Sequence, residues 1–210
     1  MGLPRLRASR DWRNSGGYIR SSGTQWIDTG ITANYTDLYV EVKGICRDTG
    51  PGAIMATGIS GDGTSGYFFG WYGTYTGINN FRVSGSKDVH THFIDGVNKQ
   101  IGIDSSIISG SPSSYNPSPS NLRLFSYTMP NEAARLSDSD VYYLIIKRNG
   151  VLIREMYPAI DDNGVACMYD YVSDQFFYNQ GTGDLIVSDE VVNTPYLNIG
   201  VPSKIQSLTF

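Results

Sequence analysis

Apolar and polar residues alternate over short stretches of this chain, and clusters of turn-forming residues separate the stretches. The clearest example lies in 141–187, where the apolar runs YYLIIKR and VLIREMY flank Asn149-Gly150. Asn-Gly readily adopts the two positive φ angles of a type I′ turn. The two runs are therefore predicted to pair as an antiparallel hairpin.

The first run of this hairpin is apolar on both faces until it nears the turn. Strict alternation divides its residues into two sets. One face carries Val141, Tyr143, Ile145 and Lys147, and the other carries Tyr142, Leu144, Ile146 and Arg148. A strand that is apolar on both sides is typical of a position covered above and below. We therefore expect this strand to be central in its sheet.

The rest of the pattern predicts more short strands and almost no helix. Turn sequences at 161–164 and 172–174 separate the strands that follow the hairpin. Residues 38–43 (LYVEVK) alternate as a strand with one buried face and one face in water, and 131–136 (NEAARL) is the one expected helical turn. Fifteen Tyr and 24 Gly favour strands joined by tight turns. The predicted fold is all-β: a two-sheet antiparallel β-sandwich of jelly-roll type with one short helical turn.

Several segments resemble a known family. The segment YIRSSGTQWIDTGI at 18–31, the strand NLRLFSY, and NGVLIREMYPA followed by NGVACMYDYVSDQFFYNQGTGDLIV are similar to parts of concanavalin A-like (laminin-G-like, jelly-roll) lectin/glucanase domains. Such domains are common in bacteriophage structural proteins and gut-bacterial surface proteins. The resemblance implies a concanavalin A-like sandwich over 18–188, an N-terminal arm at 1–17 and a C-terminal extension at 189–210. Because this fold carries many unrelated functions, function has to be argued from individual sites.

Length, cysteine content and charge limit the number of domains, the state of the cysteines and the class of partner. The 210 residues fit one domain, which can bury about 70% of its unfolded surface without needing a disulfide. For Cys46 and Cys167, the only cysteines, two reduced buried thiols are predicted, with one bridge between them as the alternative. The net charge is −4, but residues 1–17 contribute +3, so the remainder carries −7. An acidic body of this kind disfavours nucleic-acid binding.

The sequence also shows no targeting or membrane signal. It has neither the apolar core of a signal peptide nor the roughly 20 apolar residues of a membrane span. This pattern predicts a soluble protein that is made in the cytoplasm without an export signal and is not inserted into a membrane.

The most aromatic window, 67–83, holds a candidate carbohydrate platform. Flat rings stack on the C–H faces of sugars, while amides and guanidinium groups hydrogen-bond sugar hydroxyls. The candidate glycan-binding residues are Trp71, Tyr72, Tyr75, Asn79, Asn80 and Arg82. The alternative, that both faces of this segment are packed within the protein, stays open.

Recognisable catalytic motifs are missing from the sequence. Glycanases of this fold need two carboxyl groups about 5–5.5 Å apart, typically supplied by a Glu-x-Asp-x-x-Glu strand. None of the four glutamates has that arrangement: Glu41, Glu132, Glu155 and Glu190. Nucleophile-elbow, phosphate-loop and dinucleotide motifs are absent as well. We expect no catalytic residue and no enzymatic activity.

Two histidines and several aspartates are the candidate metal ligands. His90 and His92 share one face of a strand but have no third ligand at metal-site spacing, so a structural role is predicted for both. No cofactor is expected. The alternative is a calcium ion at a loop rim, as in many laminin-G-like domains. The aspartates that would supply its ligands are Asp48, Asp62, Asp161 and Asp162.

Both ends of the chain fall outside the resemblance and are predicted to contact neighbouring subunits. In the N-terminal arm, Trp12 is the expected apolar anchor and the arginines are expected to pair with acidic surface. The candidate assembly residues are Arg5, Arg7, Arg10, Trp12, Arg13, Tyr196, Leu197 and Ile199.

Together these features favour a non-enzymatic structural or decoration protein on the outer surface of a bacteriophage virion, on head or tail. Its expected partners are other virion proteins, copies of itself and host-surface glycans. The alternative is a carbohydrate-binding module on a bacterial surface, and a glycoside hydrolase or lyase ranks third. A particle component is expected to bury its termini against other chains, whereas a free-standing lectin is expected to be a monomer.

Overall fold

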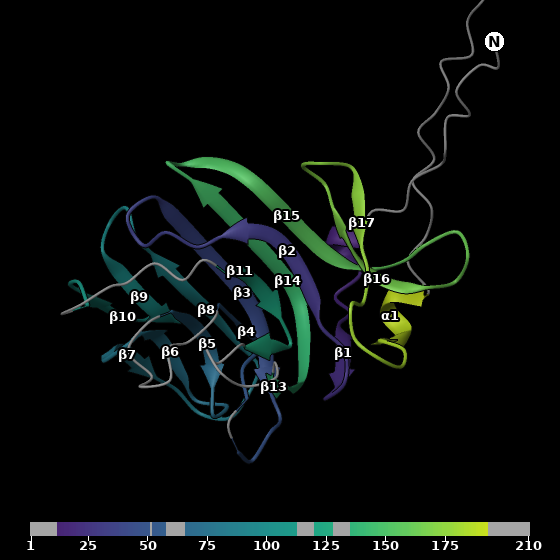
Figure 1. Ribbon diagram of the computed structural model, residues 1–210, viewed down its shortest axis with the longest axis horizontal. Helices are drawn as coiled ribbons and strands as arrows, with labels where there is room; N and C mark the ends of the chain where they lie inside the picture. Colours follow the sequence, from purple (N-terminus) through teal and green to yellow (C-terminus); the bar gives the residue numbers. More distant parts are fainter. Residues whose placement is uncertain (1–11, 51, 58–65, 113–119, 128–134, 193–210) are drawn as a thin grey trace, which may run out of the picture.

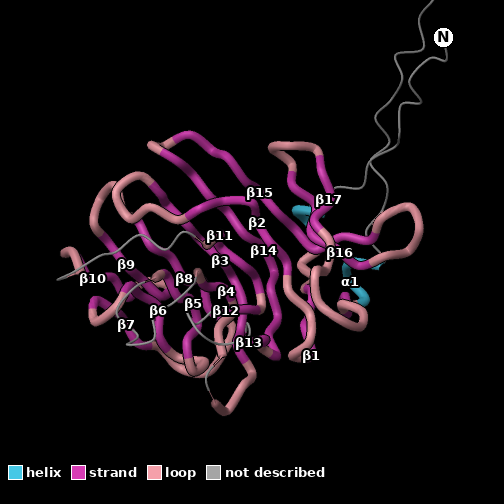
Figure 2. Tube along the Cα trace, in the orientation of Figure 1, coloured by secondary structure: helices cyan, strands magenta, loops and turns pink. Residues whose placement is uncertain are grey.

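Two antiparallel β-sheets packed face to face make up most of the molecule (Figure 1). The computed structural model describes residues 12–50, 52–57, 66–112, 120–127 and 135–192. Strands account for most of this trace, and the helical pieces are confined to the neighbourhood of its two ends (Figure 2). The prediction of a two-sheet antiparallel β-sandwich is confirmed.

The larger sheet has ten strands. Eight follow one another across the sheet, in the order β10 (Ser106–Ser109), β9 (Gln100–Ile103), β8 (His90–Asp95), β3 (Leu38–Cys46), β14 (Asp138–Arg148), β15 (Val151–Ile160), β16 (Ala166–Asp170) and β17 (Gln175–Phe177). Two further strands branch from β14: β1 (Ile19–Ser22) pairs with β14, and β18 (Ile186–Val187) pairs with β1. β3 and β14 therefore lie at the centre of the sheet, as predicted for the first strand of the hairpin.

The smaller sheet has six strands. Their order is β2 (Ile27–Thr32), β11 (Asn121–Leu124), β4 (Met55–Ala56), β5 (Tyr67–Trp71), β6 (Tyr75–Ile78) and β7 (Phe81–Ser84). A separate two-stranded pair joins β12 (Ser126–Tyr127) to β13 (Arg135–Leu136).

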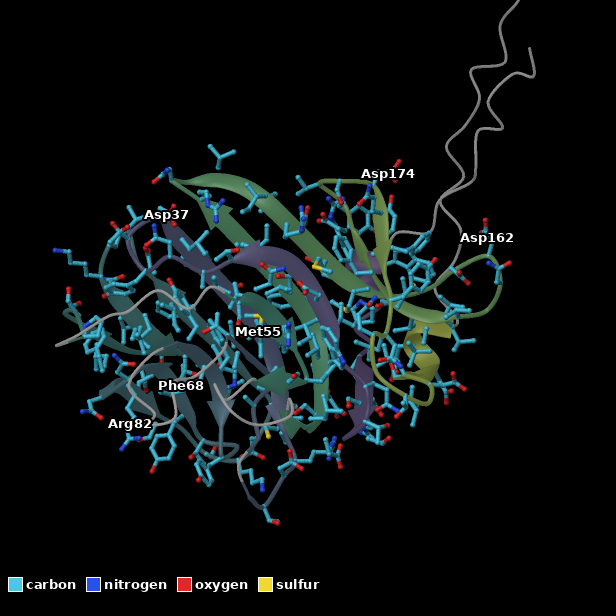
Figure 3. All side chains as sticks on the ribbon, in the orientation of Figure 1. Asp37, Met55, Phe68, Arg82, Asp162 and Asp174 are labelled. Atoms are coloured by element: carbon cyan, nitrogen blue, oxygen red, sulfur yellow. The ribbon has the colours of Figure 1, made fainter. Side chains whose placement is uncertain are left out.

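The core lies between the sheets. From the larger sheet, Val40 and Val42 of β3 and Leu144 of β14 are fully buried, and from the smaller sheet so are Tyr67 and Phe69 of β5. Met55 of β4 also lies in this interior layer (Figure 3). Burying a large apolar side chain stabilises the fold by roughly 1.5–3 kcal/mol, so this layer is the main source of stability.

Helix appears where the sequence pattern did not place it. Of the turn expected at 131–136, residues 131–134 lie outside the described residues, while Arg135 and Leu136 form strand β13. Here pairing with β12 overrides local helix propensity. The helical elements are instead a 3-10 turn, η1 (Trp12–Asn14), and the short helix α1 (Asp189–Val192).

The hairpin turn is confirmed, but the division of its first strand into faces is partly wrong. Asn149 and Gly150 have φ angles of 49° and 79°, as a type I′ turn requires. However, the register of β14 against β3 shifts between Val141 and Tyr143. This β-bulge inserts Tyr142 as an extra residue. Val141 is therefore fully buried in the core with Leu144, instead of lying on the face that carries Tyr143.

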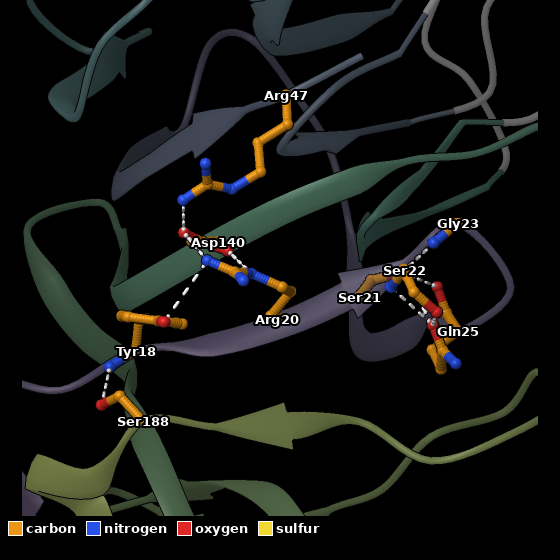
Figure 4. Close-up of polar contacts among 9 residues, drawn as sticks. All are labelled: Tyr18, Arg20, Ser21, Ser22, Gly23, Gln25, Arg47, Asp140 and Ser188. Atoms are coloured by element: carbon orange, nitrogen blue, oxygen red, sulfur yellow. Dashed lines mark hydrogen bonds and ion pairs between the residues drawn. The ribbon is translucent and has the colours of Figure 1, made fainter.

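A buried carboxylate fastens strand β1 to the centre of the larger sheet (Figure 4). Asp140 of β14 is fully buried and forms ion pairs with Arg20 of β1, at 2.6 Å, and with Arg47. Burial alone would raise the pKa of Asp140, but the hydrogen bonds from the two arginines outweigh it and lower that pKa. Nearby, the Tyr18 backbone N–H donates to Ser188 Oγ at 3.0 Å, which joins the start of β1 to the approach to α1.

Both cysteines are free and buried, as predicted. Burial raises the pKa of the Cys167 thiol to about 12 and also raises that of Cys46. Both thiols therefore remain protonated at neutral pH and belong to the packing of the sandwich.

Candidate functional site: the outer face of the larger sheet

The platform predicted in the aromatic window is divided by the fold. Tyr72, which is 46% exposed, lies in the turn between β5 and β6, whereas Asn79 and Asn80 lie in the turn at the opposite end of β6. The four residues of β6 separate these turns by about 13 Å along the strand. Tyr75 and Arg82 meet on neighbouring strands, with the guanidinium 4.8 Å from the ring centroid.

The remaining residues of that window support the alternative of internal packing. Tyr67, Phe68 and Phe69 are all buried, and the Asn79 side chain is 7% exposed. Trp71 ends strand β5. Tyr72 and the two asparagines therefore lie at opposite ends of β6, and Asn79 is largely buried.

A different surface combines half-buried rings with hydrogen-bonding groups. It is the outer face of β3 and its two neighbours, β8 and β14. The inward side chains of β3 are buried, whereas Tyr39, Glu41 and Lys43 point away from the core and are half-buried. The register places Lys147 opposite Tyr39, Phe93 opposite Glu41 and Tyr143 opposite Lys43. We call this surface the open aromatic face, and its residues are Tyr39, Glu41, Lys43, Phe93, Tyr143 and Lys147.

Two of its rings form a flat apolar surface. Tyr39 and Phe93 stack with centroids 6.2 Å apart and planes 19° from parallel. Phe93 in turn lies over Gly102 of β9, where an added Cβ would come within 2.1 Å of the Phe93 ring. Only glycine therefore allows the ring to lie in this position, flat against the sheet.

A carboxylate held by two tyrosines lies at the centre of the face. Glu41 accepts hydrogen bonds from the hydroxyl of Tyr143, at 3.0 Å, and from the hydroxyl of Tyr39. Burial, and then the hydrogen bond to Glu41, raises the pKa of Tyr39, and burial raises that of Tyr143. Both hydroxyls thus remain donors at neutral pH. The Glu41 oxygens keep further acceptor capacity that points away from the core.

Two lysines complete the surface. The ammonium of Lys43 lies 5.4 Å from the Tyr142 ring, and that of Lys147 lies 5.1 Å from the Tyr39 ring. Each can donate to a ligand above the rings while its methylene stem covers apolar surface. The open aromatic face therefore offers stacking surface, hydrogen-bond donors and an acceptor within a small area.

The aromatic surface continues beyond β14 but is covered there. The rings of Tyr143 and Tyr157 lie 6.1 Å apart on β14 and β15, and Tyr157 is in register with Tyr169 of β16. Tyr169 is in turn paired with Phe176 of β17. Beyond Tyr143, these rings and Tyr171 pack against Trp12. We call Tyr157, Tyr169, Tyr171 and Phe176 the covered aromatic face.

Trp12 and Arg13 contact their own sandwich, which differs from the predicted contact with a neighbouring subunit. Trp12 is 4% exposed and packs against Ala159, Cys167 and Val191. Arg13 forms a two-pronged pair with Glu155, at 2.9 and 2.7 Å. The small side chains of Ala159 and Cys167 leave room for the indole, so Trp12 is buried against its own chain. The other assembly candidates lie outside the described residues: Arg5, Arg7, Arg10, Tyr196, Leu197 and Ile199.

Two glutamates share the outer face without forming a close pair. Glu41 and Glu155 both lie opposite Ile145, from either side, so two strand spacings, about 10 Å, separate their backbones. Retaining glycosidases need about 5–5.5 Å between the carboxyl groups. Glu41 is already held by tyrosine hydroxyls and Glu155 by Arg13. Both carboxylates are therefore already engaged by other side chains of the protein.

The histidine pair serves the structure of the sandwich. His92 is buried with Nδ1 2.7 Å from Thr76 Oγ1, which links β8 to β6 across the core. Burial and the neighbouring His90 lower the pKa of His92 to about 4. His90 contacts Asp104 at 2.6 Å and Ser86 at 2.8 Å.

Within the described part of the chain, no three His, Cys, Asp or Glu side chains are grouped to hold a metal ion. Of the calcium candidates, Asp161 accepts hydrogen bonds from the backbone of Asn163 and Val165 within its own turn. Asp48 lies in the distant segment after β3. Asp162 is exposed and Asp62 lies outside the described residues.

Comparison with known proteins adds no assignment to this geometry. The sequence matches no family model, and neither a curated protein nor a solved structure matches the chain. Across the described ranges, none of the helices has the length and apolar character needed to span a membrane.

Proposed function

We propose that this chain is a non-enzymatic glycan-binding protein that acts as a surface component of a bacteriophage particle. The open aromatic face carries the glycan-binding part of the proposal. The particle setting rests on the sequence resemblance to concanavalin A-like domains of bacteriophage structural proteins.

The chemistry of the open aromatic face fits a sugar. A pyranose ring has apolar C–H faces, which stack on flat aromatic surface such as the Tyr39 and Phe93 pair, and a rim of hydroxyls that donate and accept hydrogen bonds. Glu41 supplies an acceptor, and Lys43 and Lys147 supply donors, around those rings. The rings and the carboxylate are held on neighbouring strands of the sheet, so little order has to be created on binding.

The state of the two carboxylates favours binding over hydrolysis. A general acid in a glycosidase must hold and release a proton next to the glycosidic bond. Glu155 is held in an ion pair with Arg13, and Glu41 accepts hydrogen bonds from the hydroxyls of two tyrosines. Both are therefore suited to accepting hydrogen bonds from sugar hydroxyls or from the protein.

A glycan array with purified protein tests the proposal, with two tyrosine variants as matched probes. Tyr143→Ala removes a ring and a donor from the open aromatic face, and we expect at least a tenfold loss of affinity for the glycans that bind. Tyr72→Ala removes an exposed ring on the smaller sheet, and we expect it to leave affinity unchanged. Thermal melting establishes that both variants are folded.

Two outcomes would overturn the glycan-binding proposal or its site. An array without any signal for the wild-type chain removes glycan binding. A loss of affinity in Tyr72→Ala, but not in Tyr143→Ala, moves the site to the aromatic window of the smaller sheet.

The alternative setting is a carbohydrate-binding module on a bacterial surface, which would use the same face. Light scattering of the full chain separates the two settings. A particle component is expected to form a defined oligomer, alone or with other virion proteins, through residues such as Arg5, Arg7, Arg10, Tyr196, Leu197 and Ile199. A chain that stays monomeric alone and with purified particles would favour the alternative.

A further inference from the structure

We infer that the Trp12–Asn14 segment closes one side of the glycan site, and that Arg13 limits the length of saccharide the site accepts. This inference rests on the proposed function. It identifies a specificity-determining residue and the direction in which the bound chain runs.

The aromatic surface continues from β14 onto the neighbouring strands. The rings of Tyr143 and Tyr157 lie 6.1 Å apart on neighbouring strands, and those of Tyr157 and Tyr171 lie 5.9 Å apart. The positions of the rings alone would therefore allow a bound saccharide to continue past β14. Without the N-terminal segment, the stacking surface would extend across β15 and β16.

Arg13 lies across the stacking surface beyond β14. Its guanidinium lies 3.8 Å from the centroid of the Tyr171 ring. The same guanidinium pairs with both carboxylate oxygens of Glu155. Glu155 lies on β15 directly opposite Ile145 of β14. Arg13 thus takes the stacking position and the acceptor that a further sugar unit would use.

The Trp12–Asn14 segment is firmly held against the sandwich. Trp12 is buried, and its backbone N–H donates to the Tyr171 hydroxyl at 2.6 Å. Five residues later, Gly17 packs so closely on α1 that an added Cβ would lie 2.4 Å from Val191 Cγ2. A saccharide would have to displace this anchored segment to extend over the covered aromatic face.

The other side of the site leads toward the edge of the larger sheet at β10. From Glu41 the outer face continues to Phe93, whose ring covers Gly102, and then to Ile107 of β10, which is 53% exposed. Four strand spacings, about 19 Å, separate β14 from β10. The ligand class is therefore a short saccharide that starts next to Arg13 and runs toward β10.

The test measures affinity against saccharide length by titration calorimetry, with oligosaccharides of the type found on the array. The wild-type chain is expected to gain affinity with length until the open face is filled, and then to level off. In Arg13→Ala the longest saccharides should bind at least threefold more tightly than to the wild type, while the shortest bind equally. Glu155→Gln, which weakens the hold on Arg13, should shift the plateau in the same direction.

Arg82→Ala is the matched control, because Arg82 also lies over a tyrosine ring but on the smaller sheet. It should reproduce the wild-type length dependence. An unchanged plateau in both Arg13→Ala and Glu155→Gln overturns the inference, as does an equal loss of affinity at every length, which would make Arg13 a direct ligand contact. Absence of any saccharide binding by the wild type overturns the proposed function instead.

Discussion

The two halves of the larger sheet's outer face are built from the same residue types but make different contacts. On β15 to β17, the tyrosines and Phe176 are covered by Trp12 and Arg13. On β3, β8 and β14, the rings lie beside Glu41 and two lysines. Aromatic content therefore does not identify a binding surface. What distinguishes the halves is whether another part of the chain already uses the rings.

The largest expected effect comes from removing the cover. Trp12→Ala takes away an indole that is 4% exposed, and such a change typically costs 3–5 kcal/mol. We expect the free energy of unfolding to fall by about 4 kcal/mol in urea titrations. Tyr72→Ala, at an exposed ring, is the control and should change it by less than about 0.5 kcal/mol. Equal losses in the two variants would show that the indole does not stabilise the covered half.

A second, smaller effect concerns acid and the open half. His92 lies in the core beneath the open aromatic face, next to Phe93, and its pKa is lowered to about 4 by burial and by His90, while Asp104 acts in the opposite direction. The unfolded chain binds a proton near pH 6.5 and the folded chain only near pH 4. Stability should therefore be complete above pH 6.5 and fall by about 3 kcal/mol as the pH drops to 4.

Denaturant titrations from pH 7 to 4 measure this loss. His92→Gln should remove most of the pH dependence in this window, whereas His90→Gln should retain it. If acid sensitivity persists in His92→Gln, another group is responsible. Hydrogen exchange at pH 4.5 sharpens the comparison, because the amides of β8 and β9 should lose protection before those of β15 and β16.

The smallest of these effects tests how the open half is shaped. In Gly102→Ala the new methyl meets the Phe93 ring, so the ring must move or the strands must part. We expect a cost of about 2 kcal/mol in thermal or urea unfolding, with weaker glycan binding. Gly150→Ala would be an unsuitable comparison because of its positive φ, whereas Gly50→Ala, at a site with open space, is a matched control. Unchanged stability in Gly102→Ala would show that Phe93 does not depend on the glycine.

The sequence pattern predicted some structural elements correctly and missed others. Asn149-Gly150 predicted the hairpin because two successive positive φ angles suit few residue pairs, and the alternation of 38–43 predicted which side of β3 is buried. The bulge at Tyr142 was missed because this strand is apolar on both faces, so the shift in alternation that an extra residue causes does not show in the pattern of apolar and polar residues. The glycan platform was sought in 67–83 for its aromatic density, although Tyr67, Phe68 and Phe69 are buried.

Local sequence by itself determined the class of fold: strands of alternating character, turns at their ends, and enough apolar surface for two layers. These properties depend on neighbours along the chain. Only the tertiary structure decided which rings lie together, because Tyr39, Phe93 and Tyr143 meet through the register of three strands that are distant in sequence. It also decided that Trp12 covers one half of the outer face and leaves the other open, since burial depends on which distant surfaces come into contact.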